Sequence, residues 1–259
     1  MKSTFFISIQ GSYKQLELSL HKNNTCLQTI KDKNLKASSL LIPYLEKILA
    51  ENRLNFADIK FICTDQGPGA FTSLRVAIAT INGLAFANQI PVIGIDGLDA
   101  LAQETISKYS QKSPEYLVCL LNAYNQDVYF SINKIGQNNK LEPANQFEQT
   151  KGYKKIDDLA AELKVKLEGS KILFTGNGTE LHKELIQNHF ADNAIIFEQE
   201  TCSANQIAKM ALEKWNTQKD LSFKIYPLYL KSQTFSVQPG LRLPGNTSNT
   251  TQSKSASLN

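Results

Sequence analysis

Hydrophobic and polar positions alternate along the first part of the chain in two rhythms. Short apolar stretches, typical of strands, are separated by longer stretches with apolar residues three or four positions apart, typical of helices. The pattern predicts strands over Thr4–Ile9, 16–20, Cys26–Ile30, Ile59–Thr64 and Ile90–Ile95, and helices over 38–50, Leu74–Ala87 and 98–109. The order of these elements is βββαβαβα, which by itself indicates an α/β lobe.

The second part of the chain repeats this order in a diverged form. The pattern predicts strands over Tyr116–Leu121, Val128–Ile132, Lys171–Thr175 and Ala194–Phe197, helices over Ile156–Leu167, Leu181–Asn188 and Ala204–Thr217, and a polar, irregular stretch over Asn133–Tyr153. We therefore divide the chain into an N-terminal lobe at 1–110, a smaller C-terminal lobe at 111–231 and a tail at 232–259. The end of the tail, Asn246–Asn259, has almost no apolar residue and cannot offset the entropy lost on ordering, so we expect the tail to be disordered.

The composition is that of an ordinary globular protein, with 42% hydrophobic and 20% charged residues. The formal net charge is +4 and the lysines are scattered, so no dense basic stripe indicates nucleic-acid binding. The cysteines, Cys26, Cys63, Cys119 and Cys202, lie far apart without a CxxC pair, which favours buried thiols and a reducing compartment. No apolar run approaches the roughly 20 residues of a membrane span. We therefore expect a soluble, cytoplasmic protein.

A glycine-rich turn stands between the predicted strand Ile59–Thr64 and the predicted helix Leu74–Ala87. Gly67 and Gly69 flank a proline and allow a sharp reversal, with a positive φ at one position. We expect the hydroxyl of Thr72 or Ser73 to cap the helix. A strand, a glycine-rich turn and a helix N-terminus can hold an anion or can simply connect two elements, and the residues leave both interpretations open.

The residues around this turn also match a known signature. Gly67–Arg75, with Val76–Thr80 and Gly83–Ala85 behind it, resembles the sequence GPGSFTGLR-IGIATAKGLA of the bacterial TsaB (YeaZ) family. Ile90–Ile95 and Tyr226–Lys231 are similar to the strand that follows it and to the late P-x-YL-R of that family. The resemblance implies two tandem ribonuclease-H-like lobes, the architecture of the actin and sugar-kinase superfamily.

Two departures from the family pattern remove charge where a nucleotide site would lie. Family members usually have I-D-T-S at the first strand turn, where this chain has Ile9–Gln10–Gly11–Ser12, and an amide cannot act as an anionic metal ligand. They often have D-A-R in the second lobe, where this chain has Asn122–Ala123–Tyr124. We therefore assign no catalytic and no metal-binding residue. Asp65 is the best-placed carboxylate, and an equally good role for it is to accept N–H groups of the turn.

The predicted helix Leu74–Ala87 is apolar nearly all round, so it needs cover on two faces. One stripe consists of Leu74, Ile78, Ile81 and Ala85, and the other of Val76, Ala79, Gly83 and Ala87. A sheet covers one of them, and either this chain or a partner covers the other. TsaB proteins use this helix and the helix at 38–50 to dimerise, with themselves or with the related TsaD. The resemblance therefore implies a partner interface that includes Leu40, Tyr44, Arg75, Ile78, Ala79, Asn82, Gly83 and Phe86.

The function that the resemblance implies is that of a non-catalytic subunit. It would support TsaD, together with the ATPase TsaE, in transferring threonylcarbamoyl to the adenosine beside the tRNA anticodon. It would contact tRNA only through the complex and carry no cofactor. The alternatives here are a homodimer, ATP or ADP at a complex interface, and an anion or nucleotide at the turn with Gly67, Gly69, Thr72 and Ser73. Two other hypotheses stay open: a kinase or peptidase of the same superfamily, and a diverged paralogue with another partner.

Overall fold

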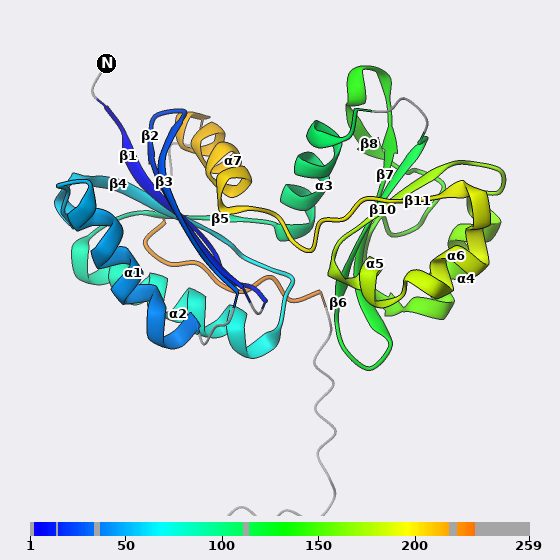
Figure 1. The fold of residues 1–259 in the computed structure, drawn as a ribbon, viewed down its shortest axis with the longest axis horizontal. Coiled ribbons are helices and arrows are strands. Elements are labelled where there is room, and N and C mark those ends of the chain that lie inside the picture. The colour runs from blue at the N-terminus through cyan, green and yellow to red at the C-terminus, as the bar shows by residue number, and fades with distance from the viewer. Residues whose placement is uncertain (1–2, 14, 34–36, 111–113, 218–221, 231–259) are drawn as a thin grey trace, which may run out of the picture.

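The computed structural model describes residues 3–13, 15–33, 37–110, 114–217 and 222–230, and the tail predicted at 232–259 lies outside the described residues. The described residues form two α/β lobes that lie side by side (Figure 1). The predicted order βββαβαβα of the first lobe is confirmed. Among the described helices, none combines the length and the apolar character needed to cross a membrane.

The first lobe is built on a sheet with the strand order β3-β2-β1-β4-β5. Its elements are β1 (Phe5–Gln10), β2 (Leu16–Lys22), β3 (Thr25–Asp32), α1 (Ala37–Glu51), β4 (Ile59–Asp65), α2 (Phe71–Asn88) and β5 (Val92–Ile95). The central strand β1 pairs antiparallel with β2 and parallel with β4. It is buried on both faces, with Ile7 and Ile9 on one side and Phe6 on the other, so helices must cover each side of the sheet.

The second lobe repeats this topology. Its elements are β6 (Tyr116–Asn122), β7 (Asp127–Ile135), β8 (Leu141–Pro143), β9 (Lys151–Lys155), α4 (Ile156–Lys166), β10 (Ile172–Thr175), α5 (Asn177–Leu181), α6 (Lys183–Phe190) and β11 (Ala194–Ile196). The sheet order is β11-β10-β6-β7-β8, with β9 also paired to β7, and β6 pairs antiparallel with β7 and parallel with β10. The prediction of two tandem lobes is therefore confirmed.

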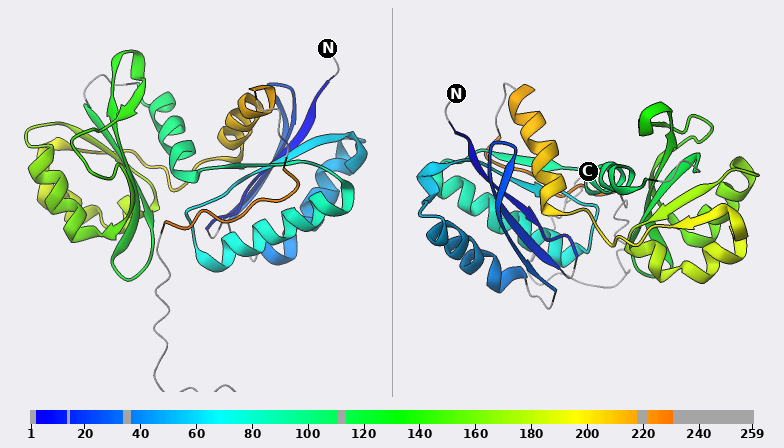
Figure 2. Two further views of the ribbon diagram at one scale, coloured as in Figure 1. Left: turned by 180° about the vertical axis from the view of Figure 1, so that it is seen from behind. Right: turned by 45° about the horizontal axis from the view of Figure 1, so that its top comes forward.

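Two further helices, α3 (Gly97–Lys108) and α7 (Ala204–Thr217), lie between the two sheets. The layers of the molecule are thus α1 with α2, the first sheet, α7 with α3, the second sheet, and α4 with α6 (Figures 1 and 2). One apolar cluster runs through the middle layer and joins Phe61 of the first sheet, Leu101 of α3, Ile207 of α7 and Leu117 of the second sheet. The two lobes therefore share a core.

The expected division at residue 110 is wrong for α7 and for the segment that follows it. α7 packs on β1, β4 and β5 of the first sheet, on the face opposite α1 and α2 (Figure 2). In the segment that follows α7, the carbonyl of Ser222 accepts a hydrogen bond from the backbone N–H of Val92 in β5 over 2.7 Å. The chain returns to the first lobe because the second face of that sheet is apolar and needs a helix to cover it.

The stretch Asn133–Tyr153 is more regular than predicted. β7 continues to Ile135, and β8 and β9 both pair antiparallel with it. The sequence of β9, KGYKK, does not alternate between apolar and polar residues. Pattern analysis misses it because its order comes from pairing with β7 rather than from an apolar face.

Candidate functional site

The glycine-rich turn is buried and packed by the rest of the chain. Gly67 has a φ of +99°, which confirms the expected positive φ, and a Cβ atom there would lie 2.7 Å from Leu74 Cδ2. A Cβ atom on Gly69 would lie 2.6 Å from the Ser12 carbonyl oxygen. That oxygen accepts the N–H of Ala70 over 2.8 Å. The turn is therefore held against the β1–β2 turn, and its glycines are needed for close backbone approach.

The expected hydroxyl cap of α2 is wrong. The helix begins at Phe71, its N-cap residue is Ala70, and no side chain makes a capping hydrogen bond. Thr72 and Ser73 consequently lie inside the first turn rather than before it. The sequence analysis placed the start of this helix at Leu74, because it took Thr72 and Ser73 for capping residues. The apolar Phe71 before them already belongs to the helix. The binding of an anion at this turn stays a prediction.

Asp65 and Gln10 lie buried beneath the turn. Asp65 Oδ1 accepts the N–H of Gly67 over 2.7 Å, which confirms its expected role toward the turn. Gln10 Nε2 donates to Ser12 Oγ over 3.0 Å and to Asp65 Oδ2 over 3.3 Å, whereas Gln10 Oε1 is buried without a partner among the described residues. Burial raises the pKa of Asp65 to about 6, and hydrogen bonds from Ser12 and Gly67 offset this only in part. The Asp65 carboxylate thus accepts hydrogen bonds from the backbone of the turn and from the Gln10 side chain, so its role here is structural.

A cleft with a volume of about 530 Å³ lies between the lobes, at the turns that follow β1 and β6. Tyr13 crosses it and donates from its hydroxyl to the Asn122 carbonyl over 3.0 Å. Burial raises the pKa of Tyr13 well above its ordinary value, so the hydroxyl stays protonated as this bond requires. The Asn122 side chain accepts the N–H of Tyr124 over 2.8 Å, so it holds its own turn. No cluster of metal-ligating side chains occurs within the described part of the chain.

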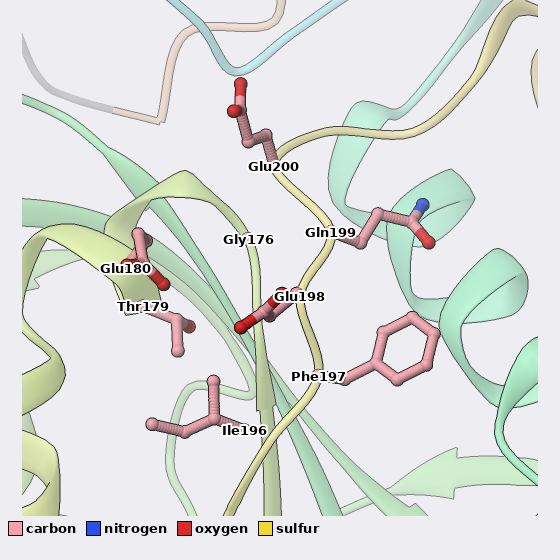
Figure 3. A pocket seen from close by; sticks show the side chains of 8 residues that line it. All are labelled: Gly176, Thr179, Glu180, Ile196, Phe197, Glu198, Gln199 and Glu200. Carbon is pink, nitrogen blue, oxygen red and sulfur yellow. The ribbon is translucent and has the colours of Figure 1, made fainter.

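Three glutamates are among the residues that line a hollow of about 360 Å³ on the second-lobe side of this cleft (Figure 3). Glu180 comes from α5, and Glu198 and Glu200 come from the segment that leads from β11 to α7. Glu180, Glu198 and Glu200 are all exposed, so solvent and salt screen the repulsion between their carboxylates and a phosphate group. The described residues that line the hollow include no Lys or Arg that could pair with the phosphates of a nucleotide.

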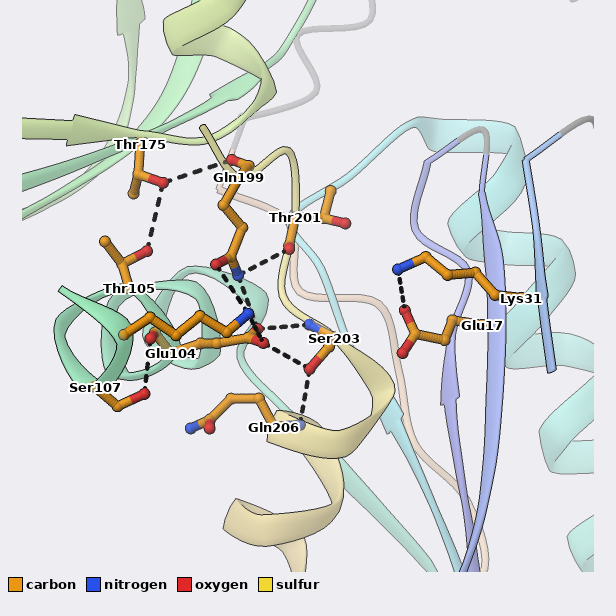
Figure 4. Close-up of polar contacts among 11 residues, drawn as sticks. Glu17, Lys31, Glu104, Thr105, Ser107, Thr175, Gln199, Thr201, Ser203 and Gln206 are labelled. Carbon is orange, nitrogen blue, oxygen red and sulfur yellow. Dashed lines mark hydrogen bonds and ion pairs between the residues drawn. The ribbon is translucent and has the colours of Figure 1, made fainter. Parts of the chain in front are cut away.

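A buried carboxylate that the sequence analysis missed joins the lobes beside this cleft. Glu104 of α3 accepts hydrogen bonds from Lys108 Nζ over 2.7 Å and Gln199 Nε2 over 2.8 Å, and from Ser203 N over 2.7 Å and Ser203 Oγ over 2.8 Å (Figure 4). These bonds connect α3, which leads from the first lobe to the second, with the segment that leads from β11 back to α7. The only signal in the sequence is a charged residue on the otherwise apolar side of the helix at 98–109.

The exposed surface of α2 is the second candidate site. Of its two apolar stripes, the one with Leu74, Ile78, Ile81 and Ala85 is buried against the sheet. Including Ile78 in the partner interface is therefore wrong, because its side chain is 3% exposed. Ala79, Gly83 and Phe86 lie on the exposed face, together with Arg75, and Phe86 is 75% exposed. On α1, Leu40 and Tyr44 are half-buried, and Tyr44 donates to Asp32 Oδ2 over 2.6 Å.

Residues 222–230, which we call the strap, lie along one side of α2. The side-chain amide of Asn82 accepts the N–H of Ile225 over 3.0 Å and donates to its carbonyl over 2.9 Å. The N–H of Leu228 donates to the carbonyl of Gln66 over 2.7 Å, beside the glycine-rich turn. Asn82 is therefore engaged by this chain itself, which the sequence could not indicate because its partner lies 143 residues away.

A model of the family described as "TsaD: tRNA N6-adenosine threonylcarbamoyltransferase" matches residues 35–234. The chain belongs to this family. Curated relatives carry the name "tRNA threonylcarbamoyladenosine biosynthesis protein TsaB". The one from Buchnera aphidicola subsp. Acyrthosiphon pisum is 26% identical over 129 residues, which are 50% of this chain and 57% of that relative. The one from Buchnera aphidicola subsp. Schizaphis graminum is 24% identical over 197 residues, which are 76% of this chain and 86% of that relative.

Solved structures resemble the fold over most of the chain. "YeaZ from Pseudomonas aeruginosa" has a TM-score of 0.68 and 20% identity, and covers 88% of this chain and 100% of that chain. A protein from the same organism, described as having similarity to peptidase YEAZ, has a TM-score of 0.70 and 21% identity over the same shares. The family, the relatives and the fold together confirm the predicted membership of the TsaB (YeaZ) family and its actin/sugar-kinase-like architecture.

Proposed function

We propose that this chain is a TsaB-type subunit that binds a TsaD-type protein and supports threonylcarbamoyl transfer to the adenosine beside the tRNA anticodon, without carrying out the transfer. The observation that carries the proposal is the exposed face of α2. Ala79, Gly83 and Ala87 line it at a spacing of four residues, and a Cβ atom on Gly83 would meet no atom within 4 Å. A ridge of small residues lets another helix approach closely.

Phe86 indicates that this face binds a protein and does not simply face solvent. It is a large aromatic side chain, 75% exposed, beside a row of small apolar residues. Exposed aromatic side chains within an apolar patch are typical of protein–protein interfaces. The α2 face therefore supports an association role, with the partner covering Phe86 and packing against Gly83.

The cleft between the lobes supports the non-catalytic part of the proposal. Gln10 and Asn122 are neutral where the family pattern has carboxylates, and Tyr13 bridges the turns that would flank the phosphates of a nucleotide. We propose that the TsaD-type partner carries the chemistry, that a TsaE-type ATPase joins the complex, and that tRNA reaches this chain only within it. The isolated chain should bind ATP–magnesium only weakly.

The test is titration of the chain with the cognate TsaD-type protein, followed by calorimetry and gel filtration. The native chain should form a complex at micromolar concentration. Gly83→Leu should weaken it about 5- to 150-fold, because overpacking of a close helix contact costs roughly 1–3 kcal/mol. Ala161→Leu, an exposed alanine of α4, is the matched control and should leave binding unchanged.

This binding experiment, together with activity assays of the isolated chain, separates the proposal from its alternatives. A failure of the native chain to form any complex at micromolar concentration would refute the partner role. Hydrolysis of ATP or cleavage of peptides by the isolated chain, lost in Gly69→Val, would support an enzyme instead. A complex that survives Gly83→Leu, with the variant fully folded, would place the partner surface elsewhere.

A further inference from the structure

Arg75 is held between two aromatic rings at the edge of the exposed α2 face. Its Cζ atom lies 3.5 Å from the ring centroid of Phe71 and 5.4 Å from that of Tyr229 in the strap. Its Nε donates to the Tyr229 hydroxyl over 2.7 Å. We call these three residues the arginine clamp. Because stacking and the hydrogen bond fix its plane, the guanidinium has already lost most of the freedom that binding would otherwise remove.

The two terminal nitrogens of Arg75 are unused. Among the described residues neither has a hydrogen-bond partner, and no carboxylate forms an ion pair with this guanidinium. The sequence of α2 contains no Asp or Glu that could serve. Both rings of the clamp are half exposed, Phe71 at 49% and Tyr229 at 48%. The clamp thus presents an oriented, unpaired fork of N–H donors at the surface.

We propose that the arginine clamp receives a carboxylate from an Asp or Glu side chain of the protein that docks on α2. The inference rests on the proposed function and names the chemistry of its contact. A planar guanidinium with two free amino groups matches a carboxylate in a bidentate arrangement. Arginine and tyrosine are also the residues over-represented among those that dominate binding energy at interfaces.

A protein fits this position better than a nucleic acid does. Tight contact with a phosphate backbone needs several cations along its path. Beside the clamp the α2 face carries Ala79, Gly83 and Phe86, which are uncharged, and in the described part of the strap the cation is Lys224. An apolar face that ends at one oriented cation is complementary to a partner helix with an apolar face and one acidic residue at its edge.

The strap takes part in this contact because it supplies Tyr229. Its own position depends on the bonds of Asn82 with Ile225 and of Gln66 with Leu228. Tyr226, which is 64% exposed, lies between the anchored residues Ile225 and Leu228. The partner therefore meets a surface made of α2 and the strap together, and recognition of the carboxylate requires that the strap is seated.

The experiment measures the affinity of the full chain for the cognate TsaD-type protein at low and high salt. Arg75→Gln should weaken binding about 10- to 100-fold at low salt and should reduce the salt dependence, because the lost contact is ionic. Arg75→Lys should restore only part of the loss, since an ammonium group cannot form the bidentate contact. Tyr229→Phe keeps the ring, loses the hydrogen bond to Nε, and should lie between native and Arg75→Gln. Lys209→Gln, an exposed cation of α7, is the control and should change affinity less than about twofold.

The outcomes separate the clamp from the proposed function. Binding by Arg75→Gln within twofold of native, with Gly83→Leu still defective, would overturn the clamp and leave the partner surface in place. Native binding by both variants, each with an unchanged melting temperature, would overturn the clamp and would place the partner surface elsewhere than on α2, whereas failure of the native chain itself to bind would refute the proposed function. If Arg75→Gln instead weakens only the binding of a labelled tRNA anticodon stem-loop, or only self-association in sedimentation, the carboxylate assignment is refuted in favour of a phosphate or of a second copy.

Discussion

Replacing Asp65 by Asn should make the protein more stable at neutral pH. Burial raises the pKa of Asp65 from 3.8 to about 6, so the folded chain binds this proton more tightly than the unfolded chain does. The contribution of the group to stability is complete below pH 3.8 and is lost as the pH rises through about 6. At pH 7 the ionised carboxylate then costs about 3 kcal/mol, because one pH unit is worth about 1.4 kcal/mol.

The substitution removes this cost and keeps the local hydrogen bonds. An amide oxygen still accepts the N–H of Gly67, and the amide of Gln10 can turn so that its unpartnered Oε1 accepts from the new amide group. We therefore expect Asp65→Asn to gain about 1–3 kcal/mol in free energy of unfolding at pH 7 relative to the native chain, and little or nothing at pH 4.

Urea denaturation of the native chain and of Asp65→Asn, at half-unit intervals from pH 4 to pH 7.5, measures the difference in their free energies of unfolding. The contributions of the other titrating groups are the same in both proteins and cancel in this difference. The difference should grow between about pH 4 and pH 6 and then level off. A difference that is constant across the range would refute the reasoning, because it would mean that Asp65 has the same pKa in both states. A variant that is less stable at pH 7 would show that the hydrogen bonds outweigh burial.

Three further changes test the turn, the helix start and the tail. Gly69→Ala should lower stability by more than about 1 kcal/mol, because its Cβ atom would lie 2.6 Å from the Ser12 carbonyl oxygen, and an unchanged melting temperature would show that the turn can shift. Thr72→Ala should change stability by less than about 0.5 kcal/mol, since α2 has no side-chain cap, and a loss near 1 kcal/mol in urea denaturation would restore Thr72 as the cap. Deletion of 246–259 should leave the melting temperature within about a degree or two, and weaker partner binding by the shortened chain would contradict a passive tail.

The sequence predicted what local geometry and periodicity determine. The positive φ at Gly67 follows from the turn itself, and the two apolar stripes of α2 follow from the helical period. The period could not say which stripe faces the sheet, because both are apolar. Ile78 was therefore assigned to the interface although it is buried, whereas Gly83 and Phe86, assigned together with it, are exposed.

The features that the sequence missed depend on contacts between distant residues. Ser8 Oγ donates to the carbonyl of Ala204 over 2.7 Å, across 196 positions, and this contact belongs to the return of α7 to the first sheet. The strap and the Glu104 cluster are of the same kind. No property of a short segment distinguishes a helix that covers its own lobe from one that covers the other, so the division at residue 110 separated elements that share a core.

The return of the chain to the first lobe also affects the order in which the protein can be completed during synthesis. The first sheet leaves the ribosome early, yet α7, which covers the face with Phe6 and Phe61, is made only after the entire second lobe. Throughout that interval the nascent chain holds a sheet with one open apolar face, which is the condition under which chaperones bind and chains aggregate. A premature stop before residue 204 therefore damages the N-terminal lobe, far from the missing residues.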